Sequence, residues 1–413
     1  CDRRQRQMCI RDRYGPKMKR NQVFQKIIED LDFAIQWLPE AGSEEANRLN
    51  KDIARHVKAR FCLNEGTHYK YHDELEYASE AEKWLQMAAT ESDKLITSGR
   101  YEIYNTGHPQ EDYFNMYRID DKSDLKEAVL YVDYKTNIRE HNMAAAGREA
   151  GCGFSKSFVE SFLCSDGLPI SLSNKYLGDE TMRKETANRD PRLKQLILTN
   201  DFPTNVTDDL KDSTFVVNED EFITQHCFTG YRPIKGFNPI YSQALYMKSS
   251  FDGIAYRYAE TLLINAEAKA ELNTITNADL DRTVNQLRDR VGMPHLTVNV
   301  GFTDPKWPDW GYSLSPVLQE IRRERCIELA GEGFRFNDLK RWKAGKLLNN
   351  VLTYVGKRKP DGNLAIVYPN YTNPDLSYQA GKSRTWEDKM YLYPIPTGEL
   401  QRNPQLLPQN PGW

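Results

Sequence analysis

The sequence of 413 residues lacks the features of several common protein classes. It has no run of about 18 apolar residues, which a membrane-spanning helix would need. Its seven cysteines show no Cys-x-x-Cys pair and no regular spacing, which argues against a zinc finger, a thioredoxin-type site and a disulfide framework. With 56 Lys and Arg against 59 Asp and Glu, the net charge of −3 gives no reason to expect nucleic acid as a partner.

Common catalytic and phosphate-binding motifs are also missing. The chain has no His-Glu-x-x-His, no Gly-x-Ser-x-Gly and no Walker-type Gly-Lys-Ser/Thr. Residues 147–157 superficially resemble a phosphate loop, but Lys156 follows a serine and no clear strand precedes it. His68 and His72 are four residues apart and could ligate a metal, although such pairs near helix ends are usually solvated. We therefore expect no catalytic residue, no metal site and no cofactor.

Apolar residues recur at helical spacing in several segments. The expected helices are 21–38, 50–69, 77–98, 254–272, 277–290, 315–331 and 335–345. In 77–98, small alanines alternate with bulky aromatic residues, as in the packing of tetratricopeptide repeats. The sequence predicts a mainly α fold, in which tetratricopeptide-like helical pairs form one compact unit.

Two regions interrupt this helical pattern. Residues 101–249 are rich in tyrosine, glycine and proline and contain β-type runs at 128–134 and 214–218, so we expect a large loop-rich insertion. Residues 346–413 are expected to be an irregular C-terminal region, and their last stretch, 394–413, holds too many prolines for regular structure and predicts an extended strap. The helical repeats are then 21–100 and 250–345.

The N-terminal residues 1–20 differ from the rest of the chain in charge. They carry eight Lys and Arg against two Asp and show no apolar periodicity. We expect this stretch to be an extraneous or disordered basic N-terminus.

One segment, 315–343, combines clear helix signals with a high density of charge. Ser315 suits the N-cap and Pro316 the first helical position, and Gly331 is a plausible stop. The charges could form a solvated face, or two carboxylates could be the acid and base of a glycoside hydrolase. However, an arginine near each acid lowers the pKa of the carboxyl, whereas a general acid needs a raised one. Because Phe334, Phe336 and Trp342 favour burial, we predict a structural ion-pair network that joins two helices. This structural signature comprises Arg322, Arg325, Glu328, Glu332, Arg335, Asp338, Arg341 and Trp342.

Aromatic residues in two loop-like stretches are the candidate ligand contacts. Residues 303–312 contain Trp307, Trp310 and Tyr312, and residues 111–118 contain Tyr113 and Tyr117. Aromatic faces stack on the apolar faces of sugar rings, while neighbouring polar groups bind hydroxyls. The alternative is that these rings attach the long loops to the helical core.

Five stretches together resemble the SusD/RagB family of surface-exposed nutrient-binding lipoproteins of Bacteroidota. They are 59–72, 188–197, 255–272, 320–345 (EIRRERCIELAGEGFRFNDLKRWKAG) and 390–413, and the resemblance covers about residues 21–413.

The resemblance implies a fold and a function. It implies a SusD-like domain with tetratricopeptide-like repeats at the outer membrane, exposed on the cell surface and attached by a lipid anchor only. The implied function is capture of an oligosaccharide or another nutrient and its delivery to a SusC-like TonB-dependent transporter, without catalysis. Cys1 is either the lipidated cysteine or part of the extraneous N-terminus. The alternatives are a glycoside hydrolase that uses paired carboxylates and a repeat-type protein-interaction scaffold.

Overall fold

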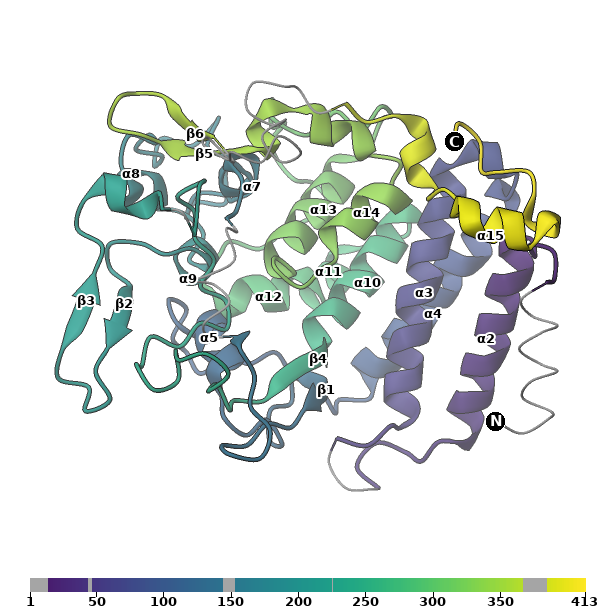
Figure 1. Ribbon diagram of the computed structural model, residues 1–413, viewed down its shortest axis with the longest axis horizontal. Helices are drawn as coiled ribbons and strands as arrows, with labels where there is room; N and C mark the ends of the chain where they lie inside the picture. Colours follow the sequence, from purple (N-terminus) through teal and green to yellow (C-terminus); the bar gives the residue numbers. More distant parts are fainter. Residues whose placement is uncertain (1–13, 44–46, 144–152, 225, 367–384) are drawn as a thin grey trace.

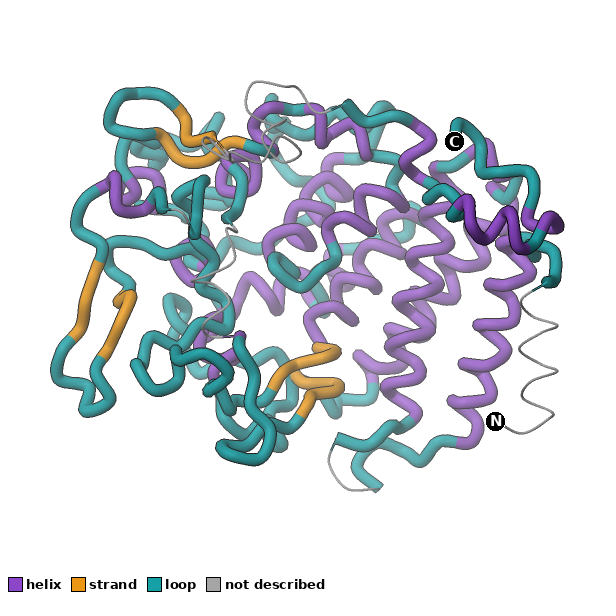
Figure 2. The backbone as a smooth tube through the Cα atoms, viewed as in Figure 1, coloured by secondary structure: helices purple, strands orange, loops and turns teal. Residues whose placement is uncertain are grey.

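The computed structural model describes residues 14–43, 47–143, 153–224, 226–366 and 385–413. Long helices stand side by side in one half of the molecule, and loops with short strands form the other half (Figures 1 and 2). This arrangement confirms the mainly α, tetratricopeptide-like fold. In the part of the chain that the structure describes, no helix has the length and apolar character needed to cross a bilayer.

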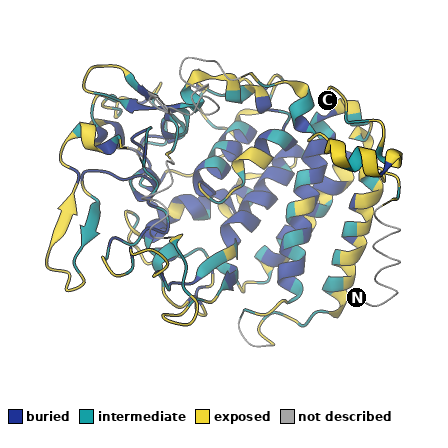
Figure 3. Ribbon diagram, viewed as in Figure 1, coloured by how far each residue is buried: buried dark blue, intermediate teal, exposed yellow. Residues whose placement is uncertain are grey.

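The described chain opens with three helices, α2 (Arg20–Trp37), α3 (Lys51–Tyr71) and α4 (Ala81–Thr97). The side chain of Asn50 accepts hydrogen bonds from the backbone N–H groups of Asp52 and Ile53, which caps α3. A Cβ at Gly66 would lie 2.9 Å from Leu85, so glycine permits the close approach of α3 to α4. The outermost helix, α2, buries fewer residues than its apolar pattern suggests (Figure 3).

The second helical group is built around α10 (Tyr258–Glu271), in which every residue except Lys269 is buried. Two short helices, α11 (Asn277–Asp281) and α12 (Val284–Arg290), replace the single helix expected at 277–290. Helix α13 (Pro316–Glu328) begins as expected, with the Ser315 hydroxyl accepting from the N–H of Leu318, and α14 (Arg335–Arg341) follows.

The helix expected at 254–272 begins too early. Residues Gly253–Arg257 form strand β4, which pairs antiparallel with β1 (Ala128–Val132). This segment alternates Ile254 and Tyr256 with smaller or polar residues, and its hydrogen bonds go to a partner more than 120 positions earlier.

The loop-rich half and the C-terminal region contain short elements. The helices are α5 (Asp112–Asn115), α7 (Lys156–Ser161), α8 (Met182–Thr186), α9 (Arg192–Leu196) and α15 (Thr397–Arg402). Two antiparallel pairs are β2 (Pro203–Val206) with β3 (Ser213–Phe215) and β5 (Val355–Arg358) with β6 (Leu364–Ile366). The 3-10 turns are Asp73–Leu75, Ala78–Glu80, Met116–Arg118, Glu219–Phe222, Gly345–Asn349, Val351–Thr353, Asp388–Tyr391 and Pro404–Leu406. The C-terminal region is therefore not irregular throughout, since it contains β5 and β6, and the expectation of no regular structure at 394–413 is wrong for α15.

The N-terminal stretch lies only partly within the described residues. Lys17 Nζ donates to the carbonyl of Pro408 at 2.7 Å, and Asn403 donates to the carbonyl of Gly15 at 3.0 Å. Arg20 is the first residue of α2 and forms a bidentate pair with Glu65 of α3. That residues 1–20 are extraneous or disordered stays a prediction, and residues 1–13 lie outside the described ranges.

A buried carboxylate at the end of α13 connects the two halves of the molecule. Glu328 accepts hydrogen bonds from Arg257 at 2.6 Å, from Arg290 at 2.6 and 2.7 Å and from Arg192 at 3.0 Å. Arg192 belongs to α9 in the loop-rich half, whereas Arg290 belongs to α12. Burial opposes the ionisation of Glu328, but Arg290, Arg257 and Arg192 outweigh it and hold the pKa of Glu328 well below its usual range.

Five further signature residues, Arg322, Arg325, Asp338, Arg341 and Trp342, take part in contacts that join α13, α14 and α10. Arg325 donates to Asp338 at 2.9 Å, and Arg341 binds Glu267 of α10 at 2.5 and 2.7 Å. Trp342 Nε1 also donates to Glu267, at 2.8 Å, and Arg322 donates to Glu271 at 2.9 Å.

Two residues near α14 lie on the surface. Arg335 is exposed, and its guanidinium carbon lies 6.0 Å from the centroid of the Trp342 ring. The expectation that Phe336 is buried is wrong, because 44% of it is exposed. Phe336 and Arg335 lie on the side of this short helix that faces solvent.

Replacing Glu328 with Ala should strongly destabilise the protein, because three buried guanidinium groups lose the acceptor that they share. We expect the free energy of unfolding, measured by urea denaturation, to fall by roughly 3–5 kcal/mol. The control Arg335→Ala removes an exposed arginine from the same segment and should change it by about 0.5 kcal/mol or less. Similar small losses in both variants would show that the network does not stabilise the fold.

Candidate functional site

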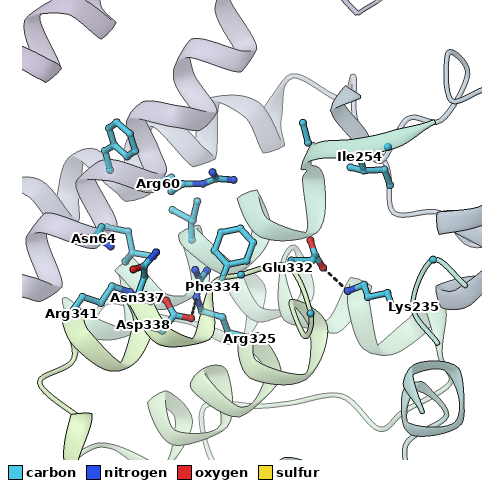
Figure 4. Close-up of a pocket in the computed structure, with 18 of the residues that line it drawn as sticks. Arg60, Asn64, Lys235, Ile254, Arg325, Glu332, Phe334, Asn337, Asp338 and Arg341 are labelled. Carbon is cyan, nitrogen blue, oxygen red and sulfur yellow. Dashed lines mark hydrogen bonds and ion pairs between the residues drawn. The ribbon is translucent and has the colours of Figure 1, made fainter. Parts of the chain in front are cut away.

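A cleft of about 1090 Å³ lies between the N-terminal helices and the turn that follows α13 (Figure 4). Helices α2 and α3 form one wall; β4, residues 233–236 and the 331–334 turn form the other. We call this the main cleft. Gly331 and Gly333 have φ of 76° and 84°, which glycine adopts readily, so the chain can turn sharply there between α13 and α14.

Aromatic side chains contribute to the walls of the main cleft. Phe61 of α3 is 39% exposed, and Phe334 and Tyr117 are partly buried. The guanidinium of Arg60 lies 5.1 Å from the Phe334 ring and 4.5 Å from the Tyr256 ring. The site therefore combines apolar ring surfaces with a positioned cationic group, an arrangement suited to a ligand that has both apolar and polar faces.

Charged side chains of both signs line the main cleft in equal number. The basic ones are Arg60, Lys235, Arg325 and Arg341; the acidic ones are Glu65, Asp252, Glu332 and Asp338. Each has a partner within the protein. Arg60 forms a bidentate pair with Glu260 of α10, Glu65 with Arg20, and Lys235 binds Glu332 at 2.6 Å.

Two side chains of the main cleft carry neutral carboxamides in place of charges. Asn64 of α3 and Asn337 of α14 both line the main cleft, at the same end of it in Figure 4. Among the described residues, neither carboxamide has a hydrogen-bond partner, and neither residue is fully buried. Their donors and acceptors are therefore available to a ligand.

A second cleft, of about 700 Å³, lies beside the 310–315 segment. Tyr71 and Tyr312 stack there with ring centroids 4.4 Å apart, and the Tyr312 hydroxyl donates to the carbonyl of Trp342 at 2.5 Å. Lys70 and Lys343 on its rim pair with Glu271 and Glu74.

The structure places the five candidate ligand contacts at different sites. Tyr117 lines the main cleft, while Trp310 and Tyr312 line the second one, so the two aromatic loops do not form one site. Tyr113 is fully buried and donates to the carbonyl of Glu328, and Trp307 is partly buried and donates to Glu320 at 2.7 Å. These contacts favour the alternative that the rings attach loops to the core, and a ligand role for any of the five residues stays a prediction.

Sequence reasoning missed the residues that face the main cleft most directly, Phe61, Asn64, Phe334 and Asn337. Helical periodicity predicted the helix at 50–69 but could not show that its Phe61 side borders a cleft. Phe334 was expected to be buried, yet it is only partly so because the cleft opens beside it.

The histidine pair on α3 is part of the protein interior. The rings of His68 and His72 stack at 4.0 Å, and His72 contacts Glu74 and the carbonyl of Lys340 through its two nitrogens. Burial lowers the pKa of His68 to about 2. In the described ranges, no group of three or more His, Cys, Asp and Glu residues could hold a metal ion.

Comparison with known proteins identifies similar chains. A family model described as the SusD family matches residues 90–413. A curated relative, SusD-like protein P2 of Formosa agariphila, is 24% identical over 410 residues. The alignment covers 96% of this chain but 66% of that relative, so the chain spans just under two thirds of the relative's length.

Solved structures share the fold. A SusD-like protein from Bacteroides fragilis superposes with a TM-score of 0.68 at 24% identity, covering 96% of this chain and 72% of that one. A SusD-like carbohydrate binding protein from the same organism gives a TM-score of 0.66 at 21% identity, covering 96% and 73%.

Trp310 should contribute mainly to stability. Its ring packs edge-on against Trp342 at 5.5 Å, and its Nε1 donates to Gln319 at 2.6 Å. We expect Trp310→Ala to lower the free energy of unfolding by roughly 3–5 kcal/mol. Trp37, which is 67% exposed on α2, provides the control, and its replacement by Ala should change this value by about 0.5 kcal/mol. Unchanged stability of Trp310→Ala together with weaker glycan binding would instead assign the ring to a ligand.

His68 should make the stability of the protein depend on pH. The unfolded chain protonates this imidazole near pH 6.5, whereas the folded protein does so only near pH 2. Between these values the unfolded state binds more protons, so the stabilising contribution is present above pH 6.5 and is lost as pH falls. The unfolding free energy of the wild type should therefore fall relative to that of His68→Gln as pH falls. Below pH 6.5 the slope of this difference should approach roughly 1.4 kcal/mol per pH unit. Parallel stability curves from pH 7 to pH 5 would contradict this.

Proposed function

This chain belongs to the SusD family, and from that premise we propose that it binds an oligosaccharide or another nutrient in the main cleft without cleaving it. The observation that carries the proposal is the lining of the cleft, where exposed and partly buried rings lie beside free carboxamides and charged groups that have partners within the protein. Rings stack on the apolar faces of sugars, and carboxamides both donate to and accept from hydroxyls. The volume of about 1090 Å³ is large enough for several sugar rings.

The carboxylates of the main cleft support binding rather than glycoside hydrolysis. A hydrolase needs two carboxyl groups beside the scissile bond, one of them with a raised pKa. Burial favours the neutral form of Glu332, but Arg257 and Lys235 outweigh it and lower its pKa. Arg325 and Arg341 similarly outweigh burial at Asp338 and lower its pKa. Neither carboxyl is suited to act as a general acid near neutral pH.

Among the described residues, Glu185 shows the opposite shift. Burial raises its pKa despite Lys156, whose Nζ lies 2.5 Å from it. The Tyr231 hydroxyl donates to the same carboxylate at 2.7 Å. Glu185 is 1% exposed and does not line the main cleft, so substrate in the cleft would not reach it.

The proposed partner is a SusC-like TonB-dependent transporter at the outer membrane, to which the protein delivers its ligand at the cell surface. Family membership supports this role, as does the description of one similar structure as a carbohydrate binding protein. Attachment by a lipid anchor belongs to the same proposal, and Cys1 lies outside the described residues. A protein-interaction scaffold remains the alternative, and stable binding of such a transporter without any glycan affinity would favour it.

Removing the exposed ring of Phe61 should weaken glycan binding without unfolding the protein. We expect the wild type to bind an oligosaccharide with a Kd between about 1 mM and 1 μM. Phe61→Ala should raise the Kd roughly fivefold, because loss of one stacked ring costs about 1 kcal/mol. Isothermal titration calorimetry against a set of oligosaccharides measures both values.

Phe215 of β3 provides a matched control, since it is 42% exposed and lies outside the main cleft. Phe215→Ala should bind as the wild type does, and both variants should keep the wild-type Tm. Shorter products after incubation of the wild type with its best oligosaccharide, detected by chromatography, would contradict the proposal and favour the hydrolase.

A further inference from the structure

We propose that the main cleft selects neutral oligosaccharides over acidic ones such as uronate-containing or sulfated glycans. This inference rests on the proposed function and adds the chemical class of the ligand. It follows from a comparison of the charged and the neutral polar side chains among the described cleft residues, namely of which have partners within the protein.

The guanidinium of Arg60, which lies beside the Phe334 and Tyr256 rings, is already paired. Arg60 directs Nε and Nη2 at the two carboxylate oxygens of Glu260, which is buried. His56 contacts the same carboxylate at 2.9 Å, and the pKa of Glu260 is lowered to about 2 because His56 and Arg60 outweigh the effect of burial. A carboxylate or sulfate on the ligand would have to compete with a fixed, fully ionised partner for Arg60.

The cations at the floor of the cleft are also ion-paired. Lys235 directs Nζ at three acceptors, Glu332, the carbonyl of Ala330 and the hydroxyl of Tyr113, at 2.6–2.8 Å. Three donors are all that an ammonium group has. Arg325 and Arg341 share Asp338, and Arg341 also binds Glu267. An acidic ligand would therefore meet an equal number of anionic and cationic side chains, with none of the cations free of a counter-charge.

The acidic side chains of the cleft disfavour an anionic ligand but not a neutral sugar. Asp252 accepts from the backbone N–H groups of Lys122 and Tyr134, at 3.0 and 2.7 Å, and its carboxylate also interacts electrostatically with the Lys122 ammonium. Desolvating a ligand anion near this carboxylate is unfavourable, whereas hydroxyl groups do not experience such repulsion.

Two of the unpartnered polar side chains in the described cleft lining are neutral carboxamides; Nη1 of Arg325 also lacks a hydrogen-bond partner, but this guanidinium is ion-paired with Asp338 through Nε. Asn64 and Asn337 each present two N–H donors and one carbonyl acceptor from facing helices. A sugar hydroxyl can donate and accept at once and so satisfies both ends of a carboxamide. A carboxylate or sulfate can only accept, and it leaves the amide oxygen facing a negative charge. The geometry therefore favours hydroxyl-bearing, uncharged sugars.

The test compares two sets of hexasaccharides by isothermal titration calorimetry. The neutral set contains cello-, manno-, xylo-, malto- and laminari-hexaose; the acidic set contains hexagalacturonate, hexamannuronate and a sulfated carrageenan hexasaccharide. Each is titrated into the wild type, Asn64→Ala, Asn337→Ala and the control Asn299→Ala, in which an exposed asparagine outside the cleft is replaced. Titrations are repeated at 0.05 and 0.5 M NaCl, because binding that depends on ligand charge is screened by salt.

We expect at least one neutral hexasaccharide to bind with a Kd that does not change between the two salt concentrations. Asn64→Ala and Asn337→Ala should each raise that Kd about three- to tenfold, and Asn299→Ala should not. Tighter binding of an acidic hexasaccharide, weakened by salt and by the two cleft variants, would overturn the inference while leaving the proposed function intact. An unchanged Kd of the neutral hexasaccharide in both Asn64→Ala and Asn337→Ala would also overturn it. If no hexasaccharide binds, this inference fails together with the oligosaccharide part of the proposed function, and another nutrient becomes the ligand to test.

Discussion

The fold depends on one carboxylate that is removed from water and surrounded by arginines. Glu328 ends α13 and receives hydrogen bonds from Arg192, Arg257 and Arg290, which belong to three separate elements. Burying four charges is costly, so the group is stable only when all partners are in place and their geometry is good. Because α9 lies in the loop-rich half and α12 in the helical half, this requirement fixes the position of one half relative to the other.

The same ion pairs continue into the floor of the main cleft. Glu332, four residues after Glu328, binds both Arg257 and Lys235. Arg257 also binds Glu328 and so connects the two carboxylates. On the other side of the turn, Arg341 attaches α14 to Glu267 of α10, and Asp338 accepts hydrogen bonds from Arg341 and from Arg325 of α13. Phe334 lies between these two anchored points. The floor is thus held in place before any ligand arrives, and a preorganised site loses little conformational freedom on binding.

This arrangement separates the groups that stabilise the protein from those left for recognition. Charged side chains are paired with one another inside or at the floor, as for Arg60 with Glu260. Ring faces and carboxamides remain at the walls, as for Phe61 and Asn64. These side chains lie on the surface of α3 and can form weak, uncharged contacts with a ligand. The walls can therefore change in sequence to suit other ligands without disturbing the buried charges.

Local signals in the sequence determined the helices, because caps and apolar periodicity act within a few residues. Ser315 and Pro316 mark a helix start that the structure reproduces. Contacts over long sequence separations were decided only by the tertiary structure. Residues 254–257 became a strand because β1 pairs with them, and Glu328 found arginines 38, 71 and 136 positions away. The cleft likewise arises where α3 packs against α14 and brings Asn64 near Asn337, since a helical pattern defines faces but not which faces meet.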